Sequence, residues 1–233
     1  MANLAPMLSV IYQDDYLIAI NKPHDLLVHR SSIAADVQEF ALQMLRDQID
    51  RHVFPAHRLD RKTGGVLLFA LDKTTEVAMQ QQFAANEVSK SYLAILRGHT
   101  PDSGEIDYPL RKENGTLQDA FTAYQTLARA ELPVAFGKHP TSRYSLVEAK
   151  PTTGRMHQLR KHFSHIFHPI IGDRTHGCNK QNKLFTETWT MNTMLLHAKS
   201  LCFNHPVTKQ PITIQAAIQP EFERMMDLMG WND

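Results

Sequence analysis

The segment from His57 to Gly65 contains the residue types most able to perform chemistry in this chain. Within it, Arg58 and Asp60 are two positions apart, so on extended backbone their side chains point to the same side. A carboxylate held beside a cation at the edge of a strand stays ionised and can act as a nucleophile or as a base. Isolated Arg-x-Asp pairs are more often ordinary surface ion pairs, so this pair alone does not identify a site.

A second feature is the stretch from residue 143 to residue 183, which holds eight Lys and Arg but only two acidic residues. The stretch therefore carries +6, and because the whole 233-residue chain carries +1, the remainder carries −5. Such a concentration of cations indicates either a solvated surface or a face that binds phosphate groups, with an affinity that depends on counterion release.

The composition limits the class of protein. With 42% hydrophobic and 21% charged residues, the chain can bury a sizeable core and is not a disordered tail. Its two cysteines, Cys178 and Cys202, are typical of reduced thiols. No apolar run approaches the roughly 20 residues that cross a bilayer, and the first residues lack a signal-peptide pattern. We therefore expect a soluble, cytoplasmic protein without a membrane partner.

Hydrophobic patterning predicts the elements that must position these residues. Strands are predicted at 10–12, 16–21, 65–71, 90–98, 120–129, 143–150, 195–203 and 212–215. Helices are predicted at 36–51, from the N-cap Asp72 to about Asn86, and at 155–166 and 220–229, with an exposed loop at 112–117. Because strands outnumber helices and do not alternate regularly with them, we predict an α+β fold with a mainly antiparallel sheet.

The predicted helix at 155–166 separates its residues by role. Met156, Leu159, Phe163 and Ile166 form a stripe at helical spacing that should face the core. Arg160 lies beside this stripe, so it can be partly buried against a carboxylate.

The chain has thirteen histidines, which raises the question of a metal site. It has no His-Glu-x-x-His motif and no cysteine pair at ligand spacing. We therefore expect the histidines to make structural hydrogen bonds, and we expect no metal and no other cofactor.

The segment His57-Arg58-Leu59-Asp60, continued by Thr63 and Gly65, resembles the catalytic motif of the RluA-type pseudouridine synthases. Gly64 is a departure, because the family usually has serine there. The other motifs of that family follow in order along nearly the whole chain. They lie at 12–29 (with Asn21-Lys22-Pro23), 90–98 (with Lys90-Ser91-Tyr92), 153–162 (Thr-Gly-Arg-Met-His-Gln-Leu-Arg-Lys-His), 168–173 and 196–198.

This resemblance implies a pseudouridine synthase fold, with a mainly antiparallel mixed sheet flanked by helices and a central active-site cleft. It implies an isomerase that converts uridine to pseudouridine in RNA without a cofactor. Asp60 would be the nucleophile, attacking either C1′ of the ribose or C6 of the uracil. Tyr92 would stack on the target base and help to remove the C5 proton, and Arg160 would pair with Asp60.

The same resemblance implies the residues that bind RNA. Arg58 would occupy the space left by the flipped nucleotide, and Leu159 would close the apolar side of the uracil pocket. Arg155, His157 and Lys161, in the arginine-containing motif, would contact the RNA.

The first motif begins by Val10, so we expect residues 1–233 to form a single catalytic domain, with no added N-terminal RNA-binding domain, that acts as a monomer. The segments at 28–31, 52–57, 131–135 and 140–144 resemble the family members that modify tRNA at uridine 65 in the T stem. The alternatives are a synthase of the same family that acts on ribosomal RNA, and a non-catalytic RNA-binding module.

Overall fold

The computed structural model describes residues 7–29 and 39–231. The chain divides into two compact units. Unit 1 comprises the residues up to Ser89 together with Ala198–Ala217, and unit 2 comprises Lys90–His197 together with the residues from Ile218 onward.

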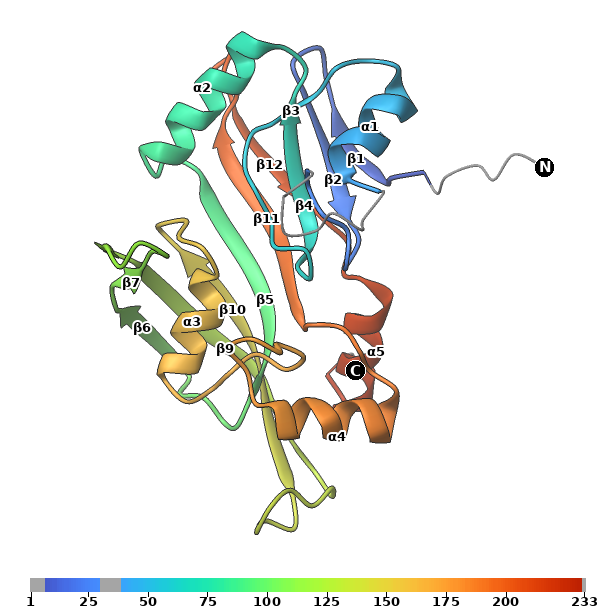
Figure 1. Cartoon of the computed structure of the whole chain (residues 1–233), viewed down its shortest axis with the longest axis vertical. Coiled ribbons are helices and arrows are strands. Elements are labelled where there is room, and N and C mark those ends of the chain that lie inside the picture. Colours follow the sequence, from blue (N-terminus) through green and yellow to red (C-terminus); the bar gives the residue numbers. More distant parts are fainter. Residues whose placement is uncertain (1–6, 30–38, 232–233) are drawn as a thin grey trace, which may run out of the picture. The chain divides into compact units, whose positions relative to one another are not determined.

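The strands of unit 1 are β1 (Val10–Gln13), β2 (Leu17–Lys22), β3 (Phe54–Pro55), β4 (Gly64–Ala70), most of β11 (Leu196–Asn204), and β12 (Pro211–Gln215). The pairs β1–β2, β2–β4, β3–β4 and β11–β12 are antiparallel. Figure 1 shows these strands with α1 and α2. The predicted turn between β1 and β2 is confirmed, and the Asp14 carboxylate accepts the N–H groups of Tyr16 and Leu17 at 2.8 and 2.7 Å.

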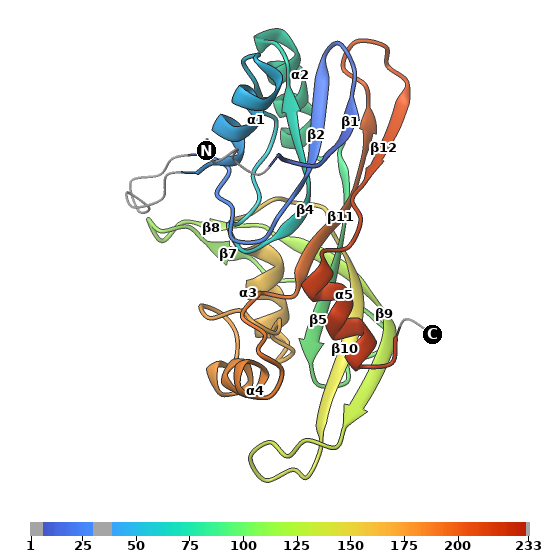
Figure 2. The same cartoon turned by 90° about the vertical axis from the view of Figure 1, so that its right-hand side faces the viewer.

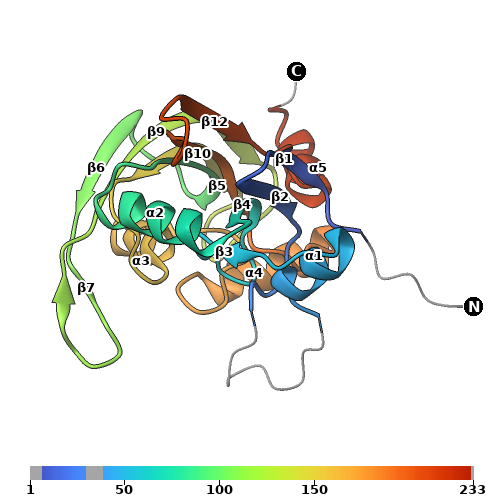
Figure 3. The same ribbon diagram turned by 90° about the horizontal axis from the view of Figure 1, so that it is seen from above.

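The two helices of unit 1 are α1 (Ala41–Ile49) and α2 (Lys73–Ala84), and α2 lies beside β3 and β4 (Figure 3). Asp72 is the predicted N-cap of α2, since its carboxylate accepts the N–H of Thr75 at 2.8 Å. The prediction of a helix from residue 36 was too long. Residues 36–38 lie outside the described part, and Phe40 has extended backbone, so α1 begins at Ala41.

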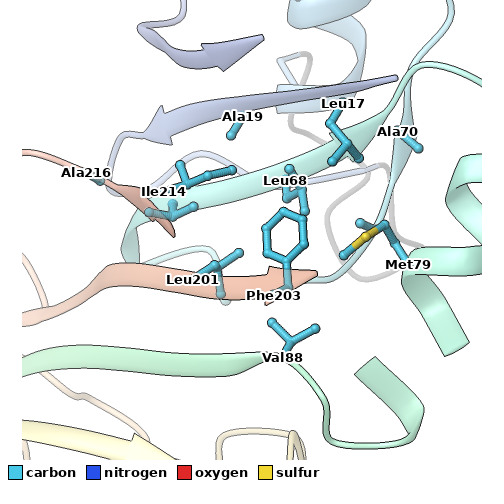
Figure 4. Close-up of a cluster of buried hydrophobic side chains, with 12 residues drawn as sticks. Leu17, Ala19, Leu68, Ala70, Met79, Val88, Leu201, Phe203, Ile214 and Ala216 are labelled. Atoms are coloured by element: carbon cyan, nitrogen blue, oxygen red, sulfur yellow. The ribbon is translucent and has the colours of Figure 1, made fainter. Parts of the chain in front are cut away.

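The core of unit 1 lies on one face of its strands (Figure 4). Leu17 and Ala19 of β2 share this face with Leu68 and Ala70 of β4, because alternate residues of a strand point the same way. The other labelled members of the cluster are Met79, Val88, Leu201, Phe203, Ile214 and Ala216. Every residue of β4 is buried, which confirms the prediction that this apolar run is an interior strand.

Unit 2 contains the antiparallel strands β5 (Ser89–Arg97), β10 (Ser142–Pro151), β9 (Phe121–Leu132) and β6 (Ser103–Asp107), paired in that order. The long hairpin of β9 and β10 is prominent in Figure 2. A separate small hairpin joins β7 (Leu110–Arg111) to β8 (Leu117–Gln118). The exposed loop predicted at 112–117 forms the turn of this small hairpin.

The helices of unit 2 are α3 (Gln158–His165), α4 (Asn179–Trp189) and α5 (Pro220–Leu228). Leu159 and Phe163 of α3 pack with one set of alternate residues on β5, and α5 packs with the other set. The predicted start of α3 at residue 155 was wrong, because His157 has a left-handed φ of 56° and the helix follows it.

Hydrophobic patterning did not predict α4, because this helix has few apolar residues. One of its buried residues is Gln181, whose amide donates to the Tyr144 hydroxyl at 2.5 Å. In the described part of the chain, the helices α1 to α5 and these antiparallel strand pairs confirm the α+β prediction. Among the residues that the structure describes, no helix is both long and apolar enough to span a membrane.

Candidate active site

Asp60 lies in the loop at 57–63 that leads into β4, which we call the Asp60 loop. Arg58 is exposed, Leu59 is buried and Asp60 is half-buried. This alternation agrees with the predicted extended spacing, which places Arg58 and Asp60 on the same side. The N–H of Thr63 donates to the carbonyl of Asp60 at 3.0 Å and closes a turn directly after the carboxylate.

Hydrogen bonds connect the Asp60 loop to the turn that follows β2. The fully buried Lys22 donates from Nζ to three carbonyl oxygens, those of Pro23 and Leu26 at 2.9 Å and that of Arg61 at 3.0 Å. In return, Nε of Arg61 donates to the carbonyl of Asp25 at 3.0 Å. The backbone next to Asp60 is therefore held by an interior lysine.

Lys22 is a residue beside Asp60 to which the sequence analysis assigned no role. Burial lowers its pKa to about 7, although attraction to Asp60 and Asp25 opposes this shift. The sequence feature that could have indicated Lys22 is its position at the end of an apolar strand, inside the Asn21-Lys22-Pro23 motif.

Gly65 brings β4 close to β11. Its φ is +107°, and a Cβ atom at this position would lie 2.2 Å from the carbonyl oxygen of Ala198. No other residue type fits there without moving the backbone. Gly64, which stands where the resembling family usually has serine, is the buried first residue of β4.

In unit 2, Tyr92 and Leu159 belong to one apolar neighbourhood. Tyr92 of β5 is partly buried and packs against the cluster that contains Leu159 and Phe163 of α3. The structure therefore brings together these two residues that the sequence placed at the uridine site.

Arg160 makes a two-pronged salt bridge inside unit 2. Its Nε and Nη2 donate to the two carboxylate oxygens of Asp173 at 2.7 and 2.8 Å, and both side chains are buried. Burial by itself would raise the pKa of Asp173, but hydrogen bonds from Arg160 and from the N–H of His176 outweigh burial and lower it. The predicted burial of Arg160 against a carboxylate is confirmed, and the partner identified here is Asp173. The pairing of Arg160 with Asp60 stays a prediction.

His157 precedes α3 and contacts a second imidazole. Its Nδ1 lies 2.9 Å from Nε2 of His176, so one of the two rings must be neutral and accept the hydrogen bond. Burial lowers the pKa of His176, and attraction to Asp173 opposes this shift. Lys161, also predicted to contact RNA, is half-buried on the first turn of α3.

The basic stretch at 143–183 is partly neutralised by the fold. Four of its eight cations form salt bridges with carboxylates: Arg143 with Glu131, Lys150 with Glu148, Arg160 with Asp173, and Lys183 with Glu187. Arg155 instead donates from Nε to the carbonyl of Asp119 at 2.9 Å. The positive charge available to a ligand is therefore smaller than the sequence count suggests, and it is concentrated on fewer residues.

Comparison with known sequences agrees with these motifs. A family model described as "RNA pseudouridylate synthase" matches residues 16–165. The chain is 48% identical to tRNA pseudouridine synthase C of Haemophilus ducreyi, over 97% of each chain. It is 45% identical to tRNA pseudouridine synthase C of Vibrio cholerae, over 97% of this chain and 98% of the relative.

Two human structures are also similar to this chain. Human RNA Pseudouridylate Synthase Domain Containing 1 has a TM-score of 0.73 at 25% identity, covering 92% of this chain and 86% of its own. Human RNA Pseudouridylate Synthase Domain Containing 4 has a TM-score of 0.71 at 26% identity, covering 95% and 93%.

Proposed function

Because the chain belongs to the RNA pseudouridylate synthase family, we propose that it isomerises uridine to pseudouridine in tRNA, at position 65 of the T stem. The observation that carries the choice of tRNA is the 48% identity, over nearly the whole of both chains, to a protein named tRNA pseudouridine synthase C. The resemblance of four non-catalytic segments supports position 65. A tRNA substrate also supports a cytoplasmic location.

The reaction rearranges one substrate without adding or losing atoms. The bond between N1 of uracil and C1′ of ribose breaks, the base turns, and a bond between C5 and C1′ forms. The proton on C5 must leave, and N1 must gain one. A nucleophile, a platform for the base and a group that assists proton removal are sufficient, so we propose that no cofactor takes part.

We propose that Asp60 is the nucleophile, attacking C1′ or C6. The support is its place on a loop that Lys22 holds by the neighbouring carbonyl of Arg61. A fixed backbone reduces the motion that a nucleophile must lose before it reacts.

We propose that Tyr92 stacks on the flipped uracil and assists removal of the C5 proton, while Leu159 closes the pocket. Their shared apolar cluster supports this division of roles, since an uncharged base is held well by aromatic and aliphatic side chains. Arg160 is the proposed partner that keeps Asp60 ionised. Its bond to Asp173 supports this role by fixing the orientation of the guanidinium.

The remaining RNA contacts are assigned to Arg58, Arg155, His157 and Lys161. Arg58 is exposed beside Asp60, as the residue that fills the space of a flipped nucleotide must be. Removing a base from a helical stem costs a few kcal/mol, and cationic contacts with the backbone offset this cost.

The test is to incubate the full chain with unmodified tRNA and to map pseudouridine by carbodiimide-dependent stops of reverse transcription. We expect one new stop at position 65, and none with Asp60→Asn. Asp47→Asn, on the exposed face of α1, removes the same charge and should leave the stop intact. Conversion of another tRNA uridine, or of ribosomal RNA alone, would refute the assigned position. Tight RNA binding with no conversion of any RNA would favour a non-catalytic module.

A further inference from the structure

Lys90 and Arg155 are two neighbouring cations of unit 2, and Lys90 is on the same strand as Tyr92, the proposed base-stacking residue. Arg155 is already proposed to contact RNA, whereas Lys90 has no role assigned above. Lys90 precedes Tyr92 by two positions on β5, so both side chains are on the same face of the strand. The Nζ of Lys90 donates to the carbonyls of Thr153 and Thr152 at 3.0 and 3.3 Å. These carbonyls belong to the link between β10 and α3, so the ammonium is held at a defined place.

Arg155 belongs to the same link and lies close enough to repel Lys90. Burial, the larger cause, and the positive charge of Arg155 together lower the pKa of Lys90 to about 8. The hydrogen bond that Arg155 makes with the carbonyl of Asp119 uses only its Nε atom. The two terminal nitrogens of the guanidinium remain as donors for a ligand.

Lys90 and Arg155 differ from the cations of unit 2 that are paired with acidic side chains. Among the described residues of this unit, six cations form salt bridges with carboxylates: Arg129, Arg143, Lys150, Arg160, Lys183 and Arg224. Within residues 7–29 and 39–231, Lys90 and Arg155 donate to carbonyl oxygens and form no salt bridge with a carboxylate. Two adjacent positive charges, one of them largely removed from water, are unfavourable unless an anion binds between them.

We propose that Lys90 and Arg155 together bind a backbone phosphate of the RNA next to the target uridine. A phosphate accepts hydrogen bonds from an ammonium and from the terminal nitrogens of a guanidinium at once. Lys90 and Tyr92 are about 7 Å apart along the strand, a distance that lets one nucleotide place its base on the ring and its phosphate on the cations. This inference rests on the proposed function, since it assigns a second contact at the same site.

Phosphate binding at Lys90 must depend on pH. A bound phosphate favours the charged ammonium, so it raises the pKa of Lys90 above its value in the free chain. RNA binding therefore takes up a proton at pH values above about 8 and weakens as pH rises further. The ionisable group that acts on Lys90 is Arg155, from the link before α3.

The test measures the affinity of the full chain for unmodified tRNA as a function of salt and pH. Lys90→Met should weaken binding roughly three- to tenfold at 0.1 M salt and reduce the slope of log Kd against log salt by about one. Wild-type affinity should fall by up to about tenfold from pH 7 to pH 9. Lys90→Arg should keep the salt slope but lose this pH dependence, because arginine stays charged over that range.

Lys183→Met is the matched control. It removes the same charge from the same unit, but from a lysine that is already paired with Glu187 on α4. Its salt slope and pH dependence should follow the wild type. A loss of folding in Lys90→Met would appear as a lower melting temperature, and Lys90→Arg then still tests the proposal through its pH profile.

The inference fails if Lys90→Met keeps the wild-type salt slope, or if Lys90→Arg keeps the wild-type pH dependence. Failure of the proposed function looks different, because wild type would then convert no tRNA uridine whatever the binding data show. Inorganic phosphate at millimolar concentration separates the two possible sources of the anion. If inorganic phosphate abolishes the difference in RNA affinity between wild type and Lys90→Met, and does so equally for short and long RNAs, the site binds free phosphate. The assignment to RNA is then wrong.

Discussion

Replacing Lys22 with methionine should change how the stability of the chain depends on pH. Lys22 is fully buried, and burial lowers its pKa to about 7, whereas a lysine in the unfolded chain titrates near its ordinary value of 10.5. Between these two values the unfolded chain binds more protons than the native one. The contribution of Lys22 to the free energy of unfolding therefore rises with pH between about pH 7 and pH 10.5.

The size of the effect follows from the two pKa values. A difference of about 3.5 pKa units corresponds to about 5 kcal/mol at full extent, of which about 2 kcal/mol is gained between pH 7 and pH 9. Methionine does not titrate, so the variant lacks this gain. It also loses the hydrogen bonds to three carbonyls. A neutral amine can donate only two of them, so the part of this loss that varies with pH belongs to the same proton equilibrium as the pKa shift.

The assay is urea unfolding of wild type and Lys22→Met at pH 7 and pH 9. The free-energy difference between the two proteins should grow by about 2 kcal/mol at the higher pH. Lys73→Met removes an exposed lysine from α2 in the same unit and should show a difference that is constant with pH. If the curves of wild type and Lys22→Met stay parallel within about 0.5 kcal/mol, Lys22 is not held in an uncharged or nearly uncharged state, and the reasoning is wrong.

Two further substitutions test the fold around the site. Asp173→Asn leaves Arg160 buried without its carboxylate and should destabilise the chain by about 3–5 kcal/mol at pH 7, measured by urea unfolding. Because the pKa of Asp173 is lowered, the stability that its carboxylate contributes is present above the ordinary aspartate pKa and is lost as pH falls. The difference in unfolding free energy between wild type and Asp173→Asn should therefore shrink below about pH 4. A difference that is unchanged at pH 3 would contradict the ion pair. Gly65→Ala should lower the free energy of unfolding by about 3 kcal/mol or more, since the added Cβ meets the carbonyl of Ala198. Gly154→Ala is the control, because its Cβ enters open space and should change that free energy by less than about 0.5 kcal/mol. Equal melting temperatures for the two variants would refute the contact at Gly65.

Local signals were enough for most elements. The apolar run after Gly64 is a buried strand, Asp72 caps α2, and the acidic turn joins β1 to β2, because each depends on residues only a few positions apart. The helix that the patterning did not predict depends on a non-local contact. The helix α4 has a weak apolar pattern, and its buried amide at Gln181 is stabilised by the hydroxyl of Tyr144, which lies 37 positions earlier.

The amino-acid sequence alone was enough to indicate the family, the residue types available for chemistry and the alternation that places Arg58 and Asp60 on the side opposite to the buried Leu59. It could do so because ordered motifs and strand alternation are properties of neighbouring residues. It could not show that Lys22 is buried behind the Asp60 loop. The tertiary structure decided this, because burial, pKa and ion pairing depend on which groups from distant parts of the chain surround a charge. For the same reason, the stretch that counts as +6 in sequence is partly neutralised in the structure, because Glu131 and Glu187 from outside it pair with Arg143 and Lys183.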